Sequence, residues 1–281
     1  MLLLPNCKIN IGLNVVSRRP DGYHNLETVF YPIPLRDDLE IKLLPESENL
    51  PYRLTQNGAK IEGEPKDNLV VKVYEAMKRE FDLPPIDIFL YKHIPMGAGL
   101  GGGSSDAASM MMAVNELFDL RLSADDMEHR IAPFGADCAF FIKNVPAYAT
   151  GIGDQLTPIH LSLSGKYIVL VKPDIFVSTK EAYAHVTPQP AQYPLAKAIE
   201  LPIECWRDKV VNDFETSVFP NHPTLVAIKR TLYDMGALYA AMSGSGSTLY
   251  GIFDRPVPEA TTVFKEHFVF TNSSLFLGDK G

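Results

Sequence analysis

A glycine-rich segment near the middle of the sequence has the residue types best suited to binding a charged ligand. Residues 97–103 contain five glycines, and an Ala- and Met-rich stretch from Ser104 to about Phe118 follows directly. Glycine lets the backbone approach a ligand closely, and the free N–H groups at the start of a helix bind anions. The segment therefore predicts a phosphate-binding loop followed by a helix, rather than a flexible linker.

This loop fits neither of two common nucleotide-binding motifs. Residues 97–102 match G-x-G-x-x-G, and Glu116 follows at the distance of a ribose-binding acid. However, Glu116 falls inside the expected helix and not at the end of a further strand. A Walker A loop would need a lysine before Ser104 and Ser105, and glycine stands there. A dinucleotide-binding dehydrogenase is therefore disfavoured.

Other segments carry polar residues that could act together with the loop. Lys8 and Asn10 lie on the same face of an expected strand over residues 8–15, because apolar residues alternate with them. Tyr23 and His24 follow a Pro-Asp-Gly turn. Asp137 stands before a Phe-Phe pair, and a second Gly/Ser loop covers residues 243–247.

The elements expected to position these residues indicate an α+β protein of two domains, at 1–158 and 159–281. Asp67 is expected to cap a helix that ends at Phe81, and Ser123 to cap a helix that runs toward Gly135. Pro133 is expected to kink that helix or end it early. Further strands are expected at 26–33, 39–43, 86–90, 167–171, 239–242 and 248–253, and further helices at 179–185 and 223–235. The stretch 188–202 is expected to be irregular or weakly helical.

Composition narrows the class of protein. The 281 residues are 46% hydrophobic and carry a net charge of −8, which gives no general attraction to nucleic acid or to an anionic membrane. The three cysteines are scattered, which indicates reduced thiols and a cytoplasmic location. We expect no membrane span, no signal peptide, no structural metal site, and a monomer or weak dimer.

The motifs together resemble the GHMP kinase superfamily. Within it, they are most similar to the branch that phosphorylates the 2-hydroxyl of 4-diphosphocytidyl-2-C-methyl-D-erythritol, on the non-mevalonate route to isoprenoid precursors. The resemblance rests on the segments 8–13, 19–24, 99–106, 149–154 and 242–247. It implies the two-domain GHMP architecture with the active site in the cleft between the domains. It also implies ATP as co-substrate, with Mg²⁺ accompanying it.

The resemblance also implies residue roles. Asp137 would take the proton of the acceptor hydroxyl, and Lys8 would keep Asp137 ionised and neutralise the transferred phosphoryl group. Tyr23 and Tyr183 would flank the cytosine, and His24 would bind its edge. The ATP-binding set would be Asn68, Leu69, Val70, Lys92, Pro95, Met96, Gly97, Ala98, Gly99, Leu100, Gly101, Gly102, Gly103, Ser104 and Ser105. The acceptor-binding set would be Asn10, Tyr23, His24, Thr179, Tyr183, Ser243 and Gly244.

Several residues also have a purely structural interpretation. Lys92 could be a solvated lysine at a strand end, Tyr183 a core residue, and the 243–247 loop a plain hairpin turn. One of Ser104 and Ser105 could be a helix N-cap. Lys8 and Asp137 could form a structural ion pair, and Tyr23 and His24 could be an exposed turn.

One departure from the branch and two other functions also stay open. Cys138-Ala139 replaces the Val-Pro of the branch, which would loosen the backbone beside Asp137. The alternative functions are a GHMP kinase for another small alcohol, of the homoserine or mevalonate type, and a non-catalytic nucleotide-binding protein.

Overall fold

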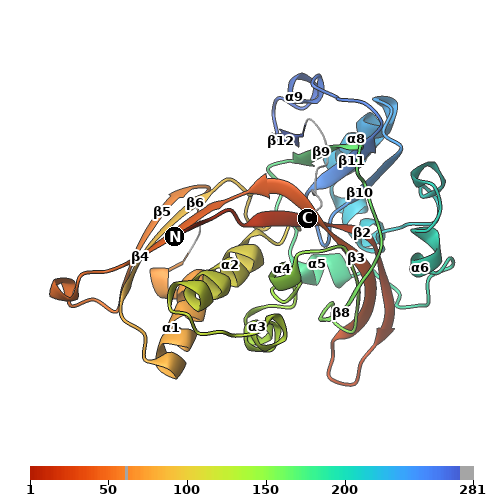
Figure 1. The fold of residues 1–281 in the computed structure, drawn as a ribbon. Helices are drawn as coiled ribbons and strands as arrows, with labels where there is room; N and C mark the ends of the chain where they lie inside the picture. Colours follow the sequence, from red (N-terminus) through yellow and green to blue (C-terminus); the bar gives the residue numbers. More distant parts are fainter. Residues whose placement is uncertain (61–62, 273–281) are drawn as a thin grey trace. The chain divides into compact units, whose positions relative to one another are not determined.

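The computed structural model describes residues 1–60 and 63–272, and they divide into two compact units (Figure 1). The first unit contains residues 1–7, 35–96 and 101–145, and the second contains residues 8–34, 97–100 and those from 146 onward. These units interleave along the chain, whereas the expected division into family domains near residue 158 is linear and stays a prediction. Among the described residues, no helix has the length and apolar content needed to cross a membrane.

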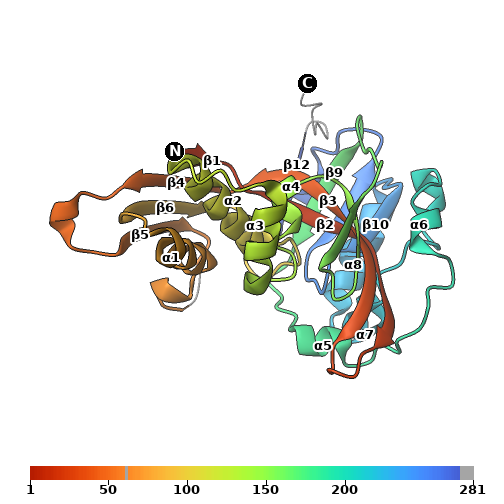
Figure 2. The same ribbon diagram turned by 60° about the horizontal axis from the view of Figure 1, so that its bottom comes forward.

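The first unit is a four-stranded sheet with helices on one face (Figures 1 and 2). The strand order is β1 (Leu2–Leu3), β4 (Asp38–Leu43), β6 (Ile86–Lys92), β5 (Tyr52–Gly58), with β5 parallel to β6 and the other pairs antiparallel. Its α-helices are α1 (Leu69–Phe81), α2 (Gly102–Leu117), α3 (Ala124–Ile131) and α4 (Phe140–Lys143). Short 3₁₀ turns lie at η1 (Glu46–Glu48), η2 (Pro65–Asp67) and η3 (Ala132–Phe134).

The helix ends in this unit follow local capping chemistry. Ser123 and Asp126 form the capping box expected at the start of α3. The helix ends at Ile131 before the 3₁₀ turn that contains Pro133, which confirms the early end. The expected Asp67 cap of α1 is wrong, because Asp67 belongs to the preceding 3₁₀ turn and Asn68 accepts the hydrogen bond from Val70 N at 3.0 Å.

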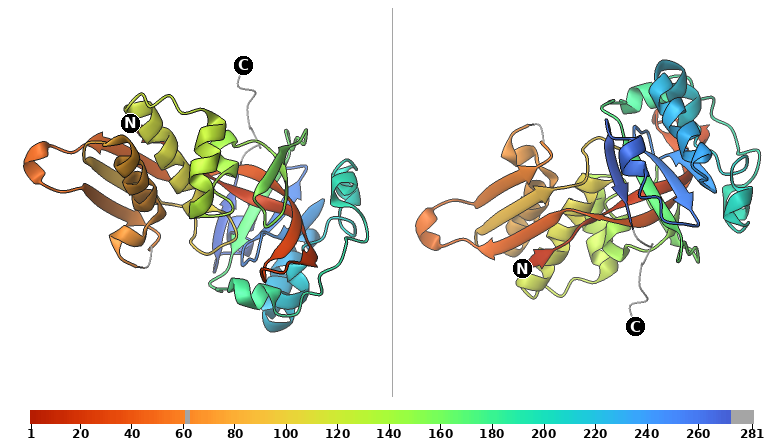
Figure 3. Two further views of the ribbon diagram at one scale, coloured as in Figure 1. Left: turned by 90° about the horizontal axis from the view of Figure 1, so that it is seen from below. Right: turned by 90° about the horizontal axis from the view of Figure 1, so that it is seen from above.

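The second unit contains two four-stranded sheets (Figure 3). One has the order β2 (Asn6–Arg18), β3 (His24–Arg36), β7 (Ala147–Thr150), β8 (Gln155–Pro158). The other has the order β10 (Tyr239–Met242), β11 (Leu249–Phe253), β9 (Tyr167–Lys172), β12 (Phe268–Thr271) and is antiparallel throughout. Its helices are α5 (Thr179–Tyr183), α6 (Leu195–Ala198), α7 (Phe214–Val218), α8 (Pro223–Asp234) and α9 (Ala260–Val263), with 3₁₀ turns η4 (Ile203–Cys205) and η5 (Phe219–Asn221).

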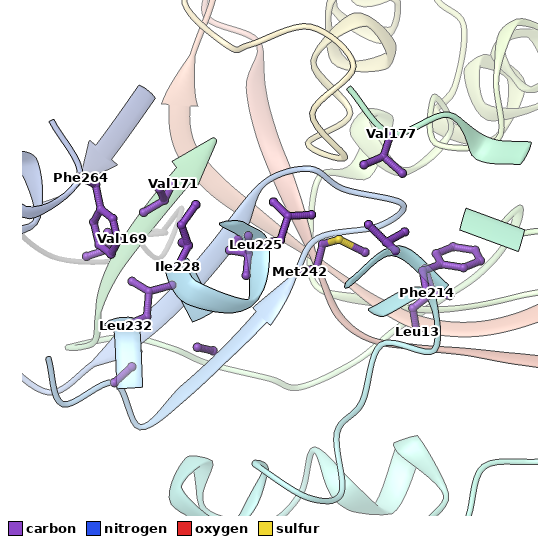
Figure 4. Close-up of a cluster of buried hydrophobic side chains, with 14 of the residues drawn as sticks. Leu13, Val169, Val171, Val177, Phe214, Leu225, Ile228, Leu232, Met242 and Phe264 are labelled. Carbon is purple, nitrogen blue, oxygen red and sulfur yellow. The ribbon is translucent and has the colours of Figure 1, made fainter. Parts of the chain in front are cut away.

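The core of the second unit lies between α8 and its sheet (Figure 4). Leu225, Ile228 and Leu232 recur at helical spacing on α8 and are buried in the same cluster as Val169 and Val171. The cluster anchors the strands that flank the second glycine loop. The stretch 188–202, expected to be irregular or weakly helical, is mostly irregular and contains the four-residue helix α6.

Candidate functional site

Lys8 and Asn10 point to the same side of β2, as their spacing predicts, and both are buried, with 3% of each residue exposed. Lys8 Nζ donates to Asn10 Oδ1 over 2.5 Å and reaches the carbonyl oxygen of Gly99 at 3.4 Å. The ammonium also lies 4.8 Å from the centre of the Phe30 ring. The polar face of the strand is therefore turned inward, onto the glycine loop, and holds a buried cation there.

Hydrogen bonds fix both the side chain and the backbone of Asn10. Its Nδ2 donates to Thr28 Oγ1 at 2.9 Å, and its carbonyl oxygen accepts from the Tyr250 hydroxyl at 2.9 Å. Thr28 Oγ1 in turn donates to the carbonyl oxygen of Gly12 at 2.5 Å. These bonds fix the amide whose oxygen orients Lys8.

The second glycine loop packs on the first. Ser243 Oγ donates to the carbonyl oxygen of Gly99 at 2.8 Å, and Asn10 N donates to Ser243 Oγ at 3.2 Å. Gly99 has φ +73°, and a Cβ on it would overlap the carbonyl oxygen of Ser243. A Cβ on Gly244 would lie 3.2 Å from Asn10 Oδ1. Residues 243–247 do lie in the hairpin connection between the antiparallel strands β10 and β11, and this connection packs against the first glycine loop. A binding role for it stays a prediction.

The glycine loop leads into α2 as expected, but the helix begins at Gly102, two residues before Ser104. The N-cap is Gly101 in the left-handed region, and it makes no side-chain cap bond. Ser105 is buried, and its N–H already bonds to the carbonyl oxygen of Gly101 at 2.9 Å. Neither serine is the N-cap, so this structural interpretation is wrong.

Lys92 lies at the end of β6 and is 2% exposed. Its ammonium donates to Asp37 and, over 2.6 Å, to Asp106 Oδ2. The alternative of a solvated lysine is therefore wrong. A contact between Lys92 and a nucleotide stays a prediction.

Asp137 lies in the turn before α4, beside the start of α2. The neighbouring Cys138 thiol is buried and hydrogen-bonded to Ser104, and burial is the main reason that its pKa rises to about 11. A Cβ on Gly135 would lie 3.2 Å from Cys138 Sγ and 3.6 Å from Ser104 Oγ. The Gly135–Asp137 turn is therefore packed against the first turn of the glycine-loop helix.

The backbone at Ala139 is compatible with the proline that the branch usually has at this position. Ala139 has φ −60° and ψ −32°, and proline would hold φ at about −65°. The backbone after Asp137 therefore already has a proline-compatible φ, and the expected loosening stays a prediction.

Two of the residues expected to bind the cytosine base, His24 and Tyr183, are in contact with each other. His24 is stacked on Tyr183 with ring centroids 4.8 Å apart, and Tyr183 also packs edge-on against Phe214 at 4.7 Å. Tyr23 is 62% exposed, so its ring is open to solvent. Thr179 opens α5, the helix that ends at Tyr183. Tyr183 thus has both a core contact and a flat aromatic partner.

The sequence matches known families over most of its length. Residues 68–154 match the GHMP kinases N terminal domain, and residues 196–269 match the GHMP kinases C terminal domain. The chain is also 54% identical over 261 residues to a 4-diphosphocytidyl-2-C-methyl-D-erythritol kinase of Bacteroides thetaiotaomicron, covering 93% of this chain and 94% of that protein. The chain belongs to the GHMP kinase family.

Other GHMP kinases extend the likeness to the whole chain. A protein of the same name from Parabacteroides distasonis is 51% identical over 278 residues, covering 99% of both chains. A crystal structure of 4-(cytidine 5'-diphospho)-2C-methyl-D-erythritol kinase matches with TM-score 0.84 and 28% identity, over 96% of this chain and 98% of that one. A homoserine kinase structure from Cytophaga hutchinsonii, at 16% identity and TM-score 0.66 over 96% of this chain and 95% of that one, shows the fold alone. The family assignment confirms the α+β GHMP fold and a kinase, and it excludes the dehydrogenase alternative.

Three residues that hold predicted site residues in the two units were not predicted from the sequence: Asp37, Thr28 and Tyr250. Asp37 is buried and holds Lys92, and the other two hold Asn10. Each comes from a strand or strand end distant in sequence from its partner, and none belongs to a recognisable motif. For Thr28, the sequence contained one indication of a special role, which is a polar residue within the largely apolar strand expected at 26–33.

Some predicted residues have contacts that leave their ligand roles untested. Asn68 caps α1 and also donates to Gln56 Oε1 at 2.7 Å, while Val70 is buried. Met96 is 39% exposed beside the loop. Among the residues that the structure describes, no group of three or more His, Cys, Asp or Glu side chains could hold a metal ion.

Proposed function

We propose that this GHMP kinase transfers the γ-phosphoryl group of ATP to the 2-hydroxyl of 4-diphosphocytidyl-2-C-methyl-D-erythritol. The step belongs to the non-mevalonate route to isoprenoid precursors. The observation that carries this proposal is the 51–54% identity, over 93–99% of the chain, to proteins that bear this activity in their names. We infer that ATP is the co-substrate and that Mg²⁺ arrives with it, neutralising the phosphate oxygens.

The glycine loop is proposed to hold the triphosphate. Its backbone is packed tightly from Gly99 to Gly102, and α2 begins directly at its end with free N–H groups. Phosphoryl transfer depends chiefly on position and charge neutralisation, which rigid backbone donors supply without reorganisation. The contact of each residue in the ATP-binding set with ATP remains a prediction.

Asp137 is proposed to accept the proton as the acceptor oxygen attacks the γ-phosphorus. The bond between the γ-phosphorus and its bridging oxygen breaks, and ADP leaves. Lys8 is proposed to favour the ionised form of Asp137 and to offset the charge on the phosphoryl oxygens. The buried position of Lys8, bonded to Asn10 and close to the Gly99 carbonyl oxygen, supports this role because a cation beside the loop is held without solvent.

The acceptor is proposed to bind through its base and its polyol. The stacked pair of His24 and Tyr183 supports a flat aromatic ligand, with Tyr23 exposed beside it and Thr179 at the start of the same helix. Asn10, Ser243 and Gly244, which lie together against Gly99, are proposed to contact the polyol. The monomer or weak dimer and the cytoplasmic location stay predictions.

The test is product formation by the purified protein. We would incubate it with ATP, Mg²⁺ and the diphosphocytidyl acceptor, and look by mass spectrometry for one added phosphate on the acceptor. Homoserine and mevalonate serve as matched acceptors. Phosphorylation of either one, and not of the diphosphocytidyl compound, contradicts the proposed substrate. ATP binding without any product indicates a non-catalytic nucleotide-binding protein.

A further inference from the structure

Three buried ionic side chains lie beneath the glycine loop. Those of Asp37 and Lys92 are fully buried, and that of Asp106 is 3% exposed. Two carboxyl groups share a single ammonium, because Lys92 Nζ donates to both Asp37 Oδ2 and Asp106 Oδ2. This Asp37–Lys92–Asp106 cluster lies entirely within the first compact unit.

One carboxylate of the cluster holds the start of the loop. Asp37 Oδ1 accepts hydrogen bonds from His93 N at 2.6 Å and from Ile94 N at 2.8 Å. These two residues follow β6 directly and are followed by Pro95 and Met96, which lead into the glycine loop. Asp37 therefore supplies the acceptor for two consecutive backbone donors at the point where the strand ends.

The other carboxylate holds the end of the loop. Asp106 lies in the first turns of α2, and its Oδ2 accepts from Lys92 Nζ at 2.6 Å. The two ends of the loop also touch, since a Cβ on Gly102 would lie 2.8 Å from Ile94 Cγ2 and 3.3 Å from Lys92 Nζ. The cluster therefore joins the residue before the loop to the helix after it.

Stability alone does not account for such a cluster. Buried ion pairs are commonly replaced by well-packed apolar residues with little loss of stability, because removing charges from water is unfavourable. Here Asp106 Oδ1 finds no hydrogen-bond partner among the described residues, so the cluster is not even fully satisfied. A directional set of charged hydrogen bonds does, however, fix geometry in a way that apolar contacts do not.

We propose that Asp37, acting through Lys92 and Asp106, is a positioning residue that sets the distance between the two ends of the glycine loop. This inference rests on the proposed function, because ATP is taken as the ligand of the loop. The cluster aligns the backbone N–H groups that receive the triphosphate. Disrupting the Asp37–Lys92–Asp106 cluster then weakens the binding of phosphates and leaves the binding of the nucleoside unchanged.

The test compares ligands that differ only in their phosphates. Asp37→Asn keeps an oxygen for His93 N and Ile94 N but turns an amide toward the Lys92 ammonium. We expect the Kd for ATP to rise about 10-fold or more, and the Kd for adenosine to stay within about twofold, by calorimetry and ligand-observed NMR. Asp119→Asn, a change at a carboxylate of the same unit whose side chain is 74% exposed, is the matched control and should leave both constants unchanged.

The outcomes separate the inference from the proposed function. A folded Asp37→Asn protein that binds ATP as tightly as the wild type contradicts the inference alone. Equal losses for ATP and adenosine also contradict it, because they indicate general disruption. If Asp37→Asn fails to fold, Asp106→Asn removes the carboxyl group at the other end of the Asp37–Lys92–Asp106 cluster. Its Kd values for ATP and adenosine then test the same inference. A wild-type protein that binds no ATP contradicts the proposed function itself.

Discussion

The imidazole of His24 is stacked on the phenol ring of Tyr183, with 4.8 Å between centroids and 20° between planes. His24 opens β3 and Tyr183 closes α5, so the stack joins two elements that are remote in sequence. Tyr183 thus already presents a face to a flat ring. A cytosine that stacks on the same face has to share or displace this imidazole.

Replacement of Tyr183 by Ala should weaken acceptor binding. Stacking of a base on an aromatic ring contributes about 1–3 kcal/mol, which corresponds to a rise of about 5–150-fold in the acceptor KM. Tyr183→Phe keeps the ring and should change the KM little. Steady-state kinetics at saturating ATP measure both, with thermal unfolding as a check because Tyr183 also packs on Phe214. An unchanged KM in the Ala variant would show that the base binds elsewhere.

Replacement of Asp137 by Asn should lower kcat by about 10²–10⁴-fold, the usual contribution of a general base. The Kd for ATP should not change, because the carboxylate is proposed to meet the acceptor hydroxyl and not the nucleotide. The matched control is Asp119→Asn, since the side chain of Asp119 is 74% exposed. A kcat loss of similar size in both variants would argue against a specific role for Asp137.

Replacement of Thr28 by Val should affect both stability and catalysis. Thr28 Oγ1 bonds Asn10 Nδ2 at 2.9 Å and the Gly12 carbonyl oxygen at 2.5 Å, and valine removes both bonds at nearly constant volume. Leaving a buried polar group unpaired lowers the free energy of unfolding by about 1–3 kcal/mol. Because Asn10 orients Lys8, kcat should also fall. Urea unfolding measures the change in stability, and initial rates measure the change in kcat. Wild-type values for both would show that Thr28 has no role in positioning Asn10.

The stability of the protein should depend on Asp106 between about pH 4 and pH 7. Burial raises the pKa of Asp106 to about 7, despite the opposing effect of Lys92. The folded state then holds a proton that the unfolded state, with a pKa near 3.8, has released. The stabilisation that this bound proton gives the folded state is fully present below about pH 4. It decreases as the pH rises from about 4 to about 7, and above pH 7 the stability no longer changes through Asp106.

Asp106→Asn isolates this dependence from that of other acids. Asp87 and Asp126 have lowered pKa values because of their hydrogen bonds to Arg53 and Ser123, and they act in the opposite direction. The free energy of unfolding should therefore be compared between wild type and variant at each pH. We expect the difference to change between about pH 4 and pH 7 and to stay constant above pH 7. A difference that stays constant between about pH 4 and pH 7 would mean that Asp106 is already ionised in the folded protein across this window.

Replacement of Ala139 by Pro should stabilise the folded protein. The observed φ of −60° suits proline, and restricting the unfolded chain at such a position raises the free energy of unfolding by about 0.4–1 kcal/mol. The acceptor KM and kcat should be retained, since the backbone beside Asp137 keeps its conformation. A lower unfolding midpoint in urea would mean that Cys138 cannot adopt the extended backbone that proline prefers before it.

Local patterns in the sequence predicted the parts of this fold that depend on neighbours. The alternation around Lys8 and Asn10 placed both on one face of β2, and Ser123 with Asp126 marked the start of α3. The polarity of the β2 face was less informative, because a polar face is ordinarily exposed and this one is buried against the glycine loop. Asp67 and Asn68 are both good N-caps, and only the preceding 3₁₀ turn decides between them.

The cluster beneath the loop could not be predicted in this way. Asp37 is 55 residues from Lys92 and lies between the end of β3 and the start of β4, so no spacing rule connects the two residues. Asp106 falls within a motif, but the motif suggests an anion-binding helix and not a buried carboxylate. The pairing depends on β4 lying beside β6, which is a property of the tertiary fold.

The close packing of Gly99 on Ser243 has a consequence for how the sequence can change. The two residues are 144 positions apart, and neither loop has room to shift independently of the other. A side chain at Gly99 would be tolerated only with a compensating rearrangement in the distant 243–247 loop. Evolutionary drift in one loop is therefore tied to the other, and a spectroscopic probe attached near residue 245 should report ligand arrival at residue 99.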